Sequence, residues 1–150
     1  LKINEKNLQL DMTLEGVLPE FQFGNGRVAI YEDRSGVLWI GTFGGGLNRF
    51  DRESENFLRY QHVPDAPQSL SDNTISDILE DRSGVLWIST FGGGLCRYDP
   101  ESDSFTSYQH DASVIQSLGT NTLTALFQDR SGNFYFHFPS PCVVLSIRRV

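Results

Sequence analysis

Three Asp-Arg-Ser-Gly segments are the first candidates for chemistry in this sequence. They begin at Asp33, Asp81 and Asp129, and an aspartate three residues before a glycine is a pattern that can collect calcium. A calcium ion takes about six to eight oxygen ligands, whereas one carboxylate per segment supplies too few. We therefore expect these segments to form tight turns, in which the aspartate accepts backbone hydrogen bonds and the glycine takes a positive φ.

Two glycine triplets and two histidines are weaker candidates. A phosphate-binding loop needs a helix N-terminus after its glycines, but the residues that follow the triplets 44–46 and 92–94 have the composition of strands. His62 and His110 each follow a Tyr-Gln pair, and two such histidines without closer partners do not make a metal site. We expect no metal and no cofactor. The triplets are interpreted as reversals that crowd their neighbours near a central axis, and the histidines as loop residues.

These candidates recur after 48 residues. Residues 31–51 and 79–99 are identical at 17 of 21 positions, and the similarity continues through the Tyr-Gln-His and Gln-Ser-Leu segments that follow. A third copy begins at Asn121, where Asn-Thr and then Asp-Arg-Ser-Gly reappear at the same offset. Residues that recur in this way are better explained by a repeated structural unit than by a single site.

Turn residues divide each repeat into four short apolar runs. In the second repeat these runs are residues 75–80, 85–90, 95–98 and 105–108, with Pro100 in the last turn. Four strands in 48 residues predict a four-stranded antiparallel meander, which is typical of a β-propeller blade. Because blades stack face to face, the second run is apolar throughout instead of alternating. We predict an all-β protein, an incomplete propeller of about three blades.

The residues that recur at the turns and in the second strand are assigned to the scaffold. We expect the tryptophans to fill the gap between neighbouring blades and the aspartates and glycines to shape the turns. The scaffold residues are Asp33, Gly36, Trp39, Asp81, Gly84, Trp87, Asp129 and Gly132.

The string Asp-Arg-Ser-Gly-Val-Leu-Trp-Ile-Gly-Thr-Phe-Gly-Gly-Gly-Leu-Asn-Arg-Phe-Asp resembles the two-component regulator propeller repeat, which occurs in the sensor regions of bacterial hybrid histidine kinases and some diguanylate cyclases. The resemblance covers residues 25–132 and is poor for residues 1–24 and 133–150. It implies that the first strand of each blade lines the central axis and that the fourth is outermost. It also implies a non-catalytic ligand-sensing module in the periplasmic or extracytoplasmic part of a membrane-anchored signalling protein, in a family whose cues are often carbohydrates.

One face of such blades is predicted to bind ligand. In a meander, the connection between strands two and three emerges on the same side as the connection to the next blade. The loops 62–72 and 110–120 differ in sequence while the strands around them hardly change, and variable loops on a constant scaffold are where binding residues concentrate. The predicted ligand-binding residues are Phe43, His62, Asp65, Phe91, His110 and Asp111.

The third repeat departs from the pattern after its turn. Tyr135 replaces the tryptophan, the glycine triplet is missing, and Pro139 and Pro141 are expected to end the strand ladder. A terminal cap or a truncated or frame-shifted fragment would explain the tail, and we favour the fragment because a cap should be polar and this tail is apolar. The chain is divided into 1–24, interpreted as the end of a preceding blade, blade 1 (25–72), blade 2 (73–120), the start of blade 3 (121–138) and a divergent tail (139–150).

Composition excludes several classes of partner. Twelve basic and 19 acidic residues give a net charge of −7, so we expect no cationic surface for nucleic acid or anionic lipid. No apolar run approaches the length of a transmembrane helix, and the first residues lack the pattern of a signal peptide. Cys96 and Cys142 match no zinc or redox motif, and their pairing stays open.

Two rivals to a sensor module are considered. A propeller glycosidase or lyase would need unrepeated acidic and basic groups clustered at the axis, and none stands out in the sequence. A protein-interaction scaffold would need no small ligand. We expect a non-enzymatic module whose partners are a carbohydrate or other small ligand and further blades of the same parent protein. Open blade faces also predict self-association, as a homo-oligomer, or marginal stability.

Overall fold

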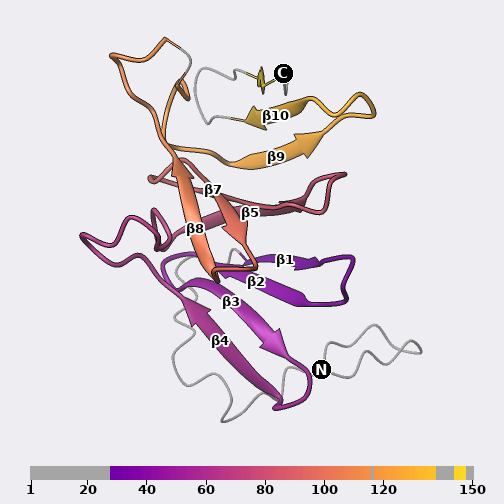
Figure 1. The fold of residues 1–150 in the computed structure, drawn as a ribbon. Coiled ribbons are helices and arrows are strands. Elements are labelled where there is room, and N and C mark those ends of the chain that lie inside the picture. The colour runs from indigo at the N-terminus through magenta and orange to yellow at the C-terminus, as the bar shows by residue number, and fades with distance from the viewer. Residues whose placement is uncertain (1–27, 116, 138–143, 148–150) are drawn as a thin grey trace.

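The structure is a computed structural model that describes residues 28–115, 117–137 and 144–147. Its described part consists of three antiparallel β-sheets, without helices, that follow one another like the blades of a fan (Figure 1). The segment 1–24 and Cys142 lie outside the described residues. The sequence prediction of an all-β, unclosed stack of propeller blades is confirmed.

Each blade is a meander in which every strand pairs with the next. Blade 1 contains β1 (Val28–Glu32), β2 (Leu38–Thr42), β3 (Gly46–Asp51) and β4 (Asn56–Tyr60). Blade 2 contains β5 (Ile75–Glu80), β6 (Leu86–Thr90), β7 (Leu95–Asp99) and β8 (Ser104–Tyr108). Blade 3 contains β9 (Ala125–Gln128), β10 (Phe134–His137) and β11 (Val144–Ile147).

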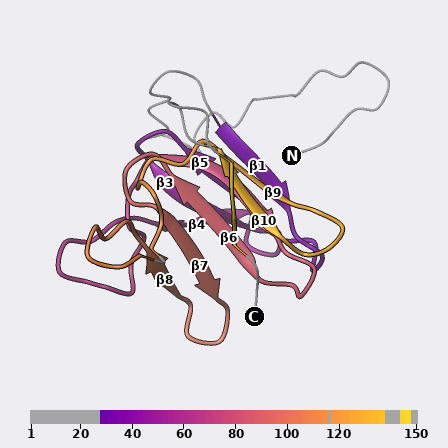
Figure 2. The same ribbon diagram turned by 90° about the horizontal axis from the view of Figure 1, so that it is seen from above.

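The first strands of the blades lie next to one another, because β5 contacts both β1 and β9. The outer strands of blades 1 and 2 diverge from this inner row, as Figures 1 and 2 show. This arrangement agrees with the expectation that the first strand is innermost and the fourth outermost. It places the inter-strand turns and the blade-to-blade loops at the two ends of each sheet.

The hydrophobic core lies between blades. One cluster joins blades 1 and 2, and a second joins blades 2 and 3. In both, apolar side chains of a second strand pack against the first and second strands of the next blade, which explains the continuous apolar run in β6. The buried members of the two clusters are Trp39, Leu47, Leu70, Ile75, Ile78, Leu86, Ile88, Cys96, Tyr98 and Phe105, and Leu95, Leu118, Leu123, Leu126, Phe134 and Phe136.

The tail contributes a strand to blade 3. β11 pairs antiparallel with β10, so the expectation that the strand ladder ends at the prolines is wrong for residues 144–147. In blade 2 Trp87 pairs with Arg97, whereas in blade 3 Tyr135 pairs with Ser146, one position beyond the 48-residue offset. The connection between the second and third strands is therefore one residue longer in blade 3, and the offset loses the strand although the backbone resumes pairing.

Candidate functional site

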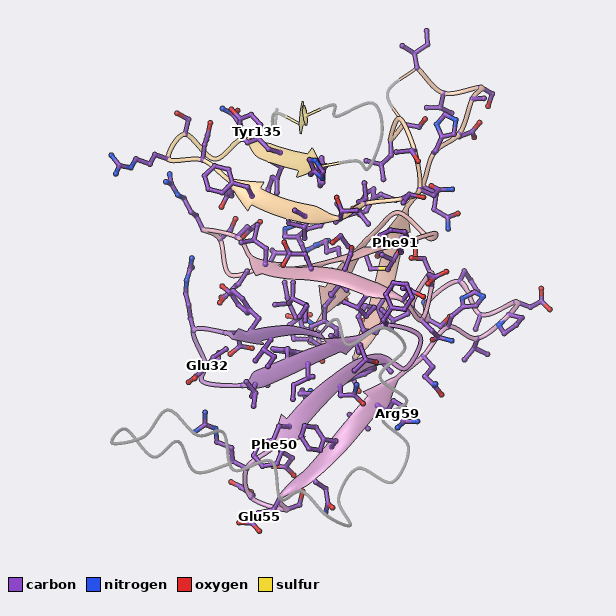
Figure 3. All side chains as sticks on the ribbon, turned by 180° about the vertical axis from the view of Figure 1, so that it is seen from behind. Glu32, Phe50, Glu55, Arg59, Phe91 and Tyr135 are labelled. Atoms are coloured by element: carbon purple, nitrogen blue, oxygen red, sulfur yellow. The ribbon has the colours of Figure 1, made fainter. Side chains whose placement is uncertain are left out.

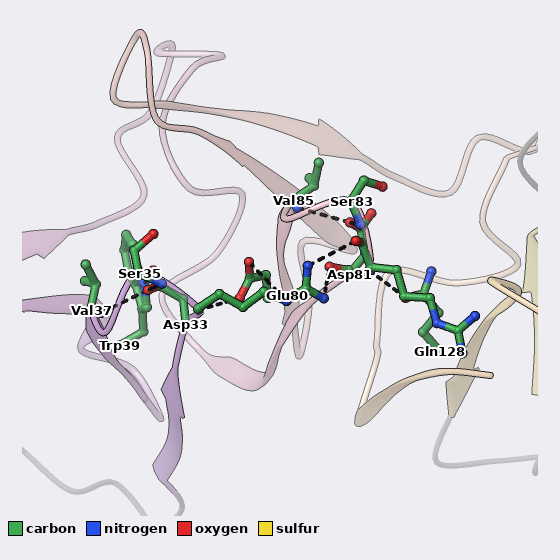
Figure 4. Close-up of polar contacts among 11 residues, drawn as sticks. Asp33, Ser35, Val37, Trp39, Glu80, Asp81, Ser83, Val85 and Gln128 are labelled. Atoms are coloured by element: carbon green, nitrogen blue, oxygen red, sulfur yellow. Dashed lines mark hydrogen bonds and ion pairs between the residues drawn. The ribbon is translucent and has the colours of Figure 1, made fainter. Parts of the chain in front are cut away.

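Each Asp-Arg-Ser-Gly segment forms the same turn (Figure 4). The Oδ1 atom of Asp81 accepts hydrogen bonds from the backbone N–H groups of Ser83 at 2.8 Å and Val85 at 3.0 Å, and Oδ2 accepts one from Nε1 of Trp87 at 3.0 Å. Asp33 makes the equivalent three bonds in blade 1. The carboxylates are thus occupied within their own turns, and the glycines take a positive φ, 82° at Gly84.

These bonds stabilise the charged carboxylates. Burial alone would raise the pKa of Asp81, but the hydrogen bonds from Trp87, Val85 and Ser83 lower it below its usual value. The pKa of Asp129 is lowered to about 2, chiefly by the side-chain amide of Asn133. The hydroxyl of Tyr135 donates to Asp129 Oδ2 at 2.9 Å, so the tyrosine in blade 3 supplies the bond that a tryptophan supplies elsewhere.

An arginine bridge between successive turns was not recognised from the sequence. The guanidinium of Arg34 donates to the carbonyl oxygens of Asp81 at 2.9 Å and Arg82 at 3.0 Å, both in blade 2. Arg82 reaches blade 3 in the same way: its guanidinium donates to the carbonyl of Arg130, and its backbone N–H donates to Gln128 Oε1 at 3.0 Å. The signal that could have revealed these bridges is the recurrence of arginine after each turn aspartate.

The tryptophans lie between blades. Trp39 of blade 1 is 2% exposed, and its ring centroid lies 5.0 Å from that of Tyr98 in blade 2. Trp87 of blade 2 takes the equivalent place against Phe134 of blade 3, at 5.4 Å. This geometry is that of the expected inter-blade packing residue.

A polar cluster also joins blades 1 and 2. The hydroxyls of Tyr60, in β4, and Tyr98, in β7, both donate to Asp103 Oδ1 at 2.6 Å. The guanidinium of Arg49 donates to Tyr98 at 3.2 Å and lies 4.0 Å from the Asp103 carboxylate. The tyrosine hydrogen bonds lower the pKa of Asp103, while burial followed by the bond to Asp103 raises the pKa of Tyr60. We refer to Arg49, Tyr60, Tyr98 and Asp103 as the tyrosine–aspartate cluster.

The glycine turns and the blade-to-blade loops do lie on one side of the blades. The N–H groups of Gly44 and Gly46 donate to the carbonyl of Asn73, at 3.1 and 2.8 Å, and the N–H of Gly94 donates to that of Asn121 at 2.8 Å. A Cβ on Gly46 would overlap the carbonyl oxygen of Tyr60. The close approach expected of the triplets is therefore present, but it is to the end of the fourth strand rather than to a group at the axis.

The structure divides the six predicted ligand-binding residues into an aromatic pair and two loop pairs. The rings of Phe43 and Phe91 contact each other with centroids 5.9 Å apart, and Phe91 is exposed on the side of the loops (Figure 3). Nothing joins this pair to the other four residues, which lie on the loops that follow the outermost strands.

The loop residues are largely held by their own loops. Nδ1 of His62 lies 2.8 Å from the carbonyl oxygen of Leu70, and Nδ1 of His110 lies 2.6 Å from that of Leu118. Asp111 accepts hydrogen bonds from the hydroxyl and backbone N–H of Ser113, which lower its pKa. Asp65 is exposed and has a φ of 65°, a left-handed conformation that aspartate tolerates.

A groove of about 680 Å³ opens beside Trp87, Tyr108 and Phe134, and of the six predicted residues only Asp111 lines it. Between blades 1 and 2 the corresponding space is occupied by Tyr98 and Phe105 of the next blade, and the N–H of Phe105 donates to the carbonyl of Gln68 at 2.9 Å. The groove is thus the position where the third and fourth strands of a following blade would pack.

Within the described residues, no three His, Cys, Asp or Glu side chains gather as metal ligands. No helix in the same part of the chain is long and apolar enough to cross a membrane. Cys96 is buried and free.

The stacked meanders and their recurring turns define a β-propeller repeat protein. Residues 22–44 and 69–92 match the family model described as the two component regulator propeller. The repeats of this chain therefore belong to the two-component regulator propeller family. No curated protein matches the chain at a significant level.

Solved structures agree with this family. The extracellular domain of a Bacteroides thetaiotaomicron protein assigned as the hybrid two component system BT3049 is 30% identical, with a TM-score of 0.65 over 73% of this chain and 15% of that domain. The extracellular domain of BT4673, from the same organism and assigned as a one component system, is 26% identical, with a TM-score of 0.59 over 81% of this chain and 18% of that one. The chain thus spans less than a fifth of the length of these relatives.

A virginiamycin B lyase from Staphylococcus aureus is similar in fold only. It is 14% identical, with a TM-score of 0.53 over 80% of this chain and 40% of the lyase. This likeness shows a shared propeller architecture and carries no activity to this chain.

Proposed function

We propose that this chain is a non-catalytic part of a ligand-sensing propeller, in the extracytoplasmic sensor region of a membrane-anchored two-component protein of the hybrid histidine kinase type. The observation that carries the proposal is the constancy of two blades beneath loops that differ in sequence and emerge on one side with the glycine turns. The similarity to extracellular domains of two-component systems supports the same conclusion.

The ligand class we propose is a neutral oligosaccharide. Phe43 and Phe91 offer an aromatic surface on the loop side, and sugar rings pack on such surfaces through their apolar faces. The net charge of −7 disfavours anionic ligands. Binding would be transmitted if the ligand had different affinities for two arrangements of the parent protein.

The proposal is tested by calorimetric titration with a panel of neutral gluco-, manno-, xylo- and galacto-oligosaccharides. For a sugar that binds, Phe91→Ala and Phe43→Ala should each weaken binding by about tenfold or more, since a lost aromatic contact costs about 1.4 kcal/mol or more. Leu58→Ala, which removes an exposed apolar side chain from β4, is the matched control and should leave affinity unchanged. Unchanged affinity in both phenylalanine variants would place the site elsewhere.

The rival functions give different results in the same experiment. Cleavage of any oligosaccharide on the panel, detected as new reducing ends or unsaturated products, would favour a propeller glycosidase or lyase. A complete absence of small-ligand binding would favour a protein-interaction scaffold.

A further inference from the structure

The two end faces of the blade stack differ from the internal faces in the exposure of equivalent side chains. We define the leading face of a blade as the one turned toward the preceding blade and the trailing face as the one turned toward the next. Ile78 and Leu126, on the leading faces of blades 2 and 3, are 5% and 8% exposed, whereas Ile30, at the same repeat position in blade 1, is 62% exposed. The leading face of blade 1 is therefore an inter-blade surface without a packed partner at Ile30.

This difference extends across the leading face. Leu86, Ile88, Tyr98 and Phe105 of blade 2 are all buried against blade 1. Their counterparts in blade 1 are only partly buried, and the paired rings of Phe50 and Phe57 lie 4.9 Å apart at the positions of Tyr98 and Phe105. Counterparts of the blade 2 residues, one repeat earlier, are Leu38, Ile40, Phe50 and Phe57.

The trailing face of blade 3 shows the complementary defect. Phe127 is 61% exposed, while its counterparts Leu79 and Tyr31 pack against the inter-blade clusters. Its ring lies 6.1 Å from that of Tyr135, which occupies the position of the inter-blade tryptophans. Both rings border a largely apolar hollow of about 410 Å³. Arg130 follows the turn aspartate of blade 3, at the position from which Arg34 and Arg82 reach the next turn.

We propose that the leading face of blade 1 packs on the trailing face of blade 3 of a second copy of this chain, and that two copies close a six-bladed ring. The contact continues the interface already present between blades 1 and 2, with Ile30 and Phe50 in place of Ile78 and Tyr98. Closed propellers have about four to eight blades, so two copies of three blades fall within the range and one copy does not. Each contact is heterologous, but a pair of them closes with twofold symmetry and leaves neither end face open.

The mass of the 150-residue polypeptide in solution tests the proposal, by light scattering over a wide concentration range. The wild-type chain should have twice the mass of 16.9 kDa. Ile30→Asp and Phe127→Asp should each give monomers, because either one removes both contacts of the ring. Ile115→Asp, a change at a fully exposed loop residue on neither end face, is the control and should remain dimeric. Both end-face positions are exposed within one copy, and far-UV circular dichroism checks folding.

Mixing distinguishes head-to-tail packing from a symmetric contact of one face with itself. The Ile30→Asp variant keeps an intact trailing face and the Phe127→Asp variant keeps an intact leading face, so an equimolar mixture should form a heterodimer through one contact, weaker than the wild-type dimer. Ile30→Thr and Phe127→Thr repeat the experiment if an aspartate variant fails to fold. A wild-type monomer, a wild-type trimer or open-ended series, aspartate variants that remain dimeric, or a mixture that stays monomeric would each overturn the proposal.

Discussion

The interface between blades 1 and 2 and the interface between blades 2 and 3 arise from the same repeat but are filled to different extents. In the first, Trp39 is almost completely buried, and Tyr98 and Phe105 cover the outer half. In the second, Trp87 is half-buried and Tyr108 is 43% exposed beside the groove. The inner half of each interface thus depends on the first two strands of the following blade, and the outer half on its third and fourth strands.

The comparison shows how a blade acquires stability from its neighbour. A meander cannot bury both of its faces by itself, so each face depends on the next repeat for its apolar and polar partners. The tyrosine–aspartate cluster is present where blade 2 supplies Tyr98 and Asp103 to blade 1. Between blades 2 and 3, within the described residues, Tyr108 has no such carboxylate partner.

The largest expected difference between the interfaces is at the tryptophans. Trp39→Ala should lower the free energy of unfolding by about 3–5 kcal/mol, the usual cost of deleting a buried large aromatic side chain. Trp87→Ala should cost about 2 kcal/mol, because its ring already borders a groove and loses fewer contacts. Urea unfolding followed by far-UV circular dichroism measures both. Equal losses would show that the outer strands add nothing to the first interface.

A smaller difference is expected at the equivalent tyrosines Tyr60 and Tyr108. Tyr60→Phe removes a hydrogen bond to Asp103 and should cost about 1 kcal/mol, reduced from the value for a buried charged pair because the Asp103 side chain is 50% exposed. Tyr108→Phe is the matched control and should change stability by less than about 0.5 kcal/mol.

A double-mutant cycle then isolates the cluster. Asp103→Asn suits the backbone, whose φ of 49° asparagine also tolerates, and its cost should not add fully to that of Tyr60→Phe. A coupling of about 0.5–1 kcal/mol is expected from the unfolding midpoints. Full additivity of the two changes would mean that the bond at 2.6 Å contributes nothing to stability.

Most of the blade architecture could be predicted from the sequence because its signals are local and repeated. The turn glycines and the apolar runs fixed the boundaries of β5 to β8 to within one residue. β11 could not be found in this way. Its connection to β10 is one residue longer than in blade 2, so a fixed offset compares Ser146 with Tyr98 instead of its register partner Arg97.

The polar contacts between blades could not be predicted because they join residues from different repeats. Arg34 recurs beside each turn aspartate, yet its partners are carbonyl oxygens of the next turn, and a backbone acceptor leaves no mark on residue type. Asp103 corresponds to Glu55 in blade 1, so comparison of the repeats concealed its role. The predicted ligand-binding residues were placed on the correct side of the blades, but the sequence did not show that both histidines bond to their own loops.

The smallest expected effect is the acid dependence of the turn in blade 3. The folded pKa of Asp129 is about 2, below the value of about 4 for an unfolded aspartate, so the unfolded chain binds more protons between these pH values. The contribution of Asp129 to stability is therefore complete above about pH 4 and is lost as the pH falls toward 2. Asp129→Asn should make the unfolding midpoint in urea less dependent on pH over this range. Tyr135→Phe, which removes one bond to the carboxylate, should keep the dependence but move it to higher pH. Parallel curves for the wild type and Asp129→Asn would show that the charged turn of blade 3, unlike the buried turn of Asp81 in blade 2, does not contribute to folding.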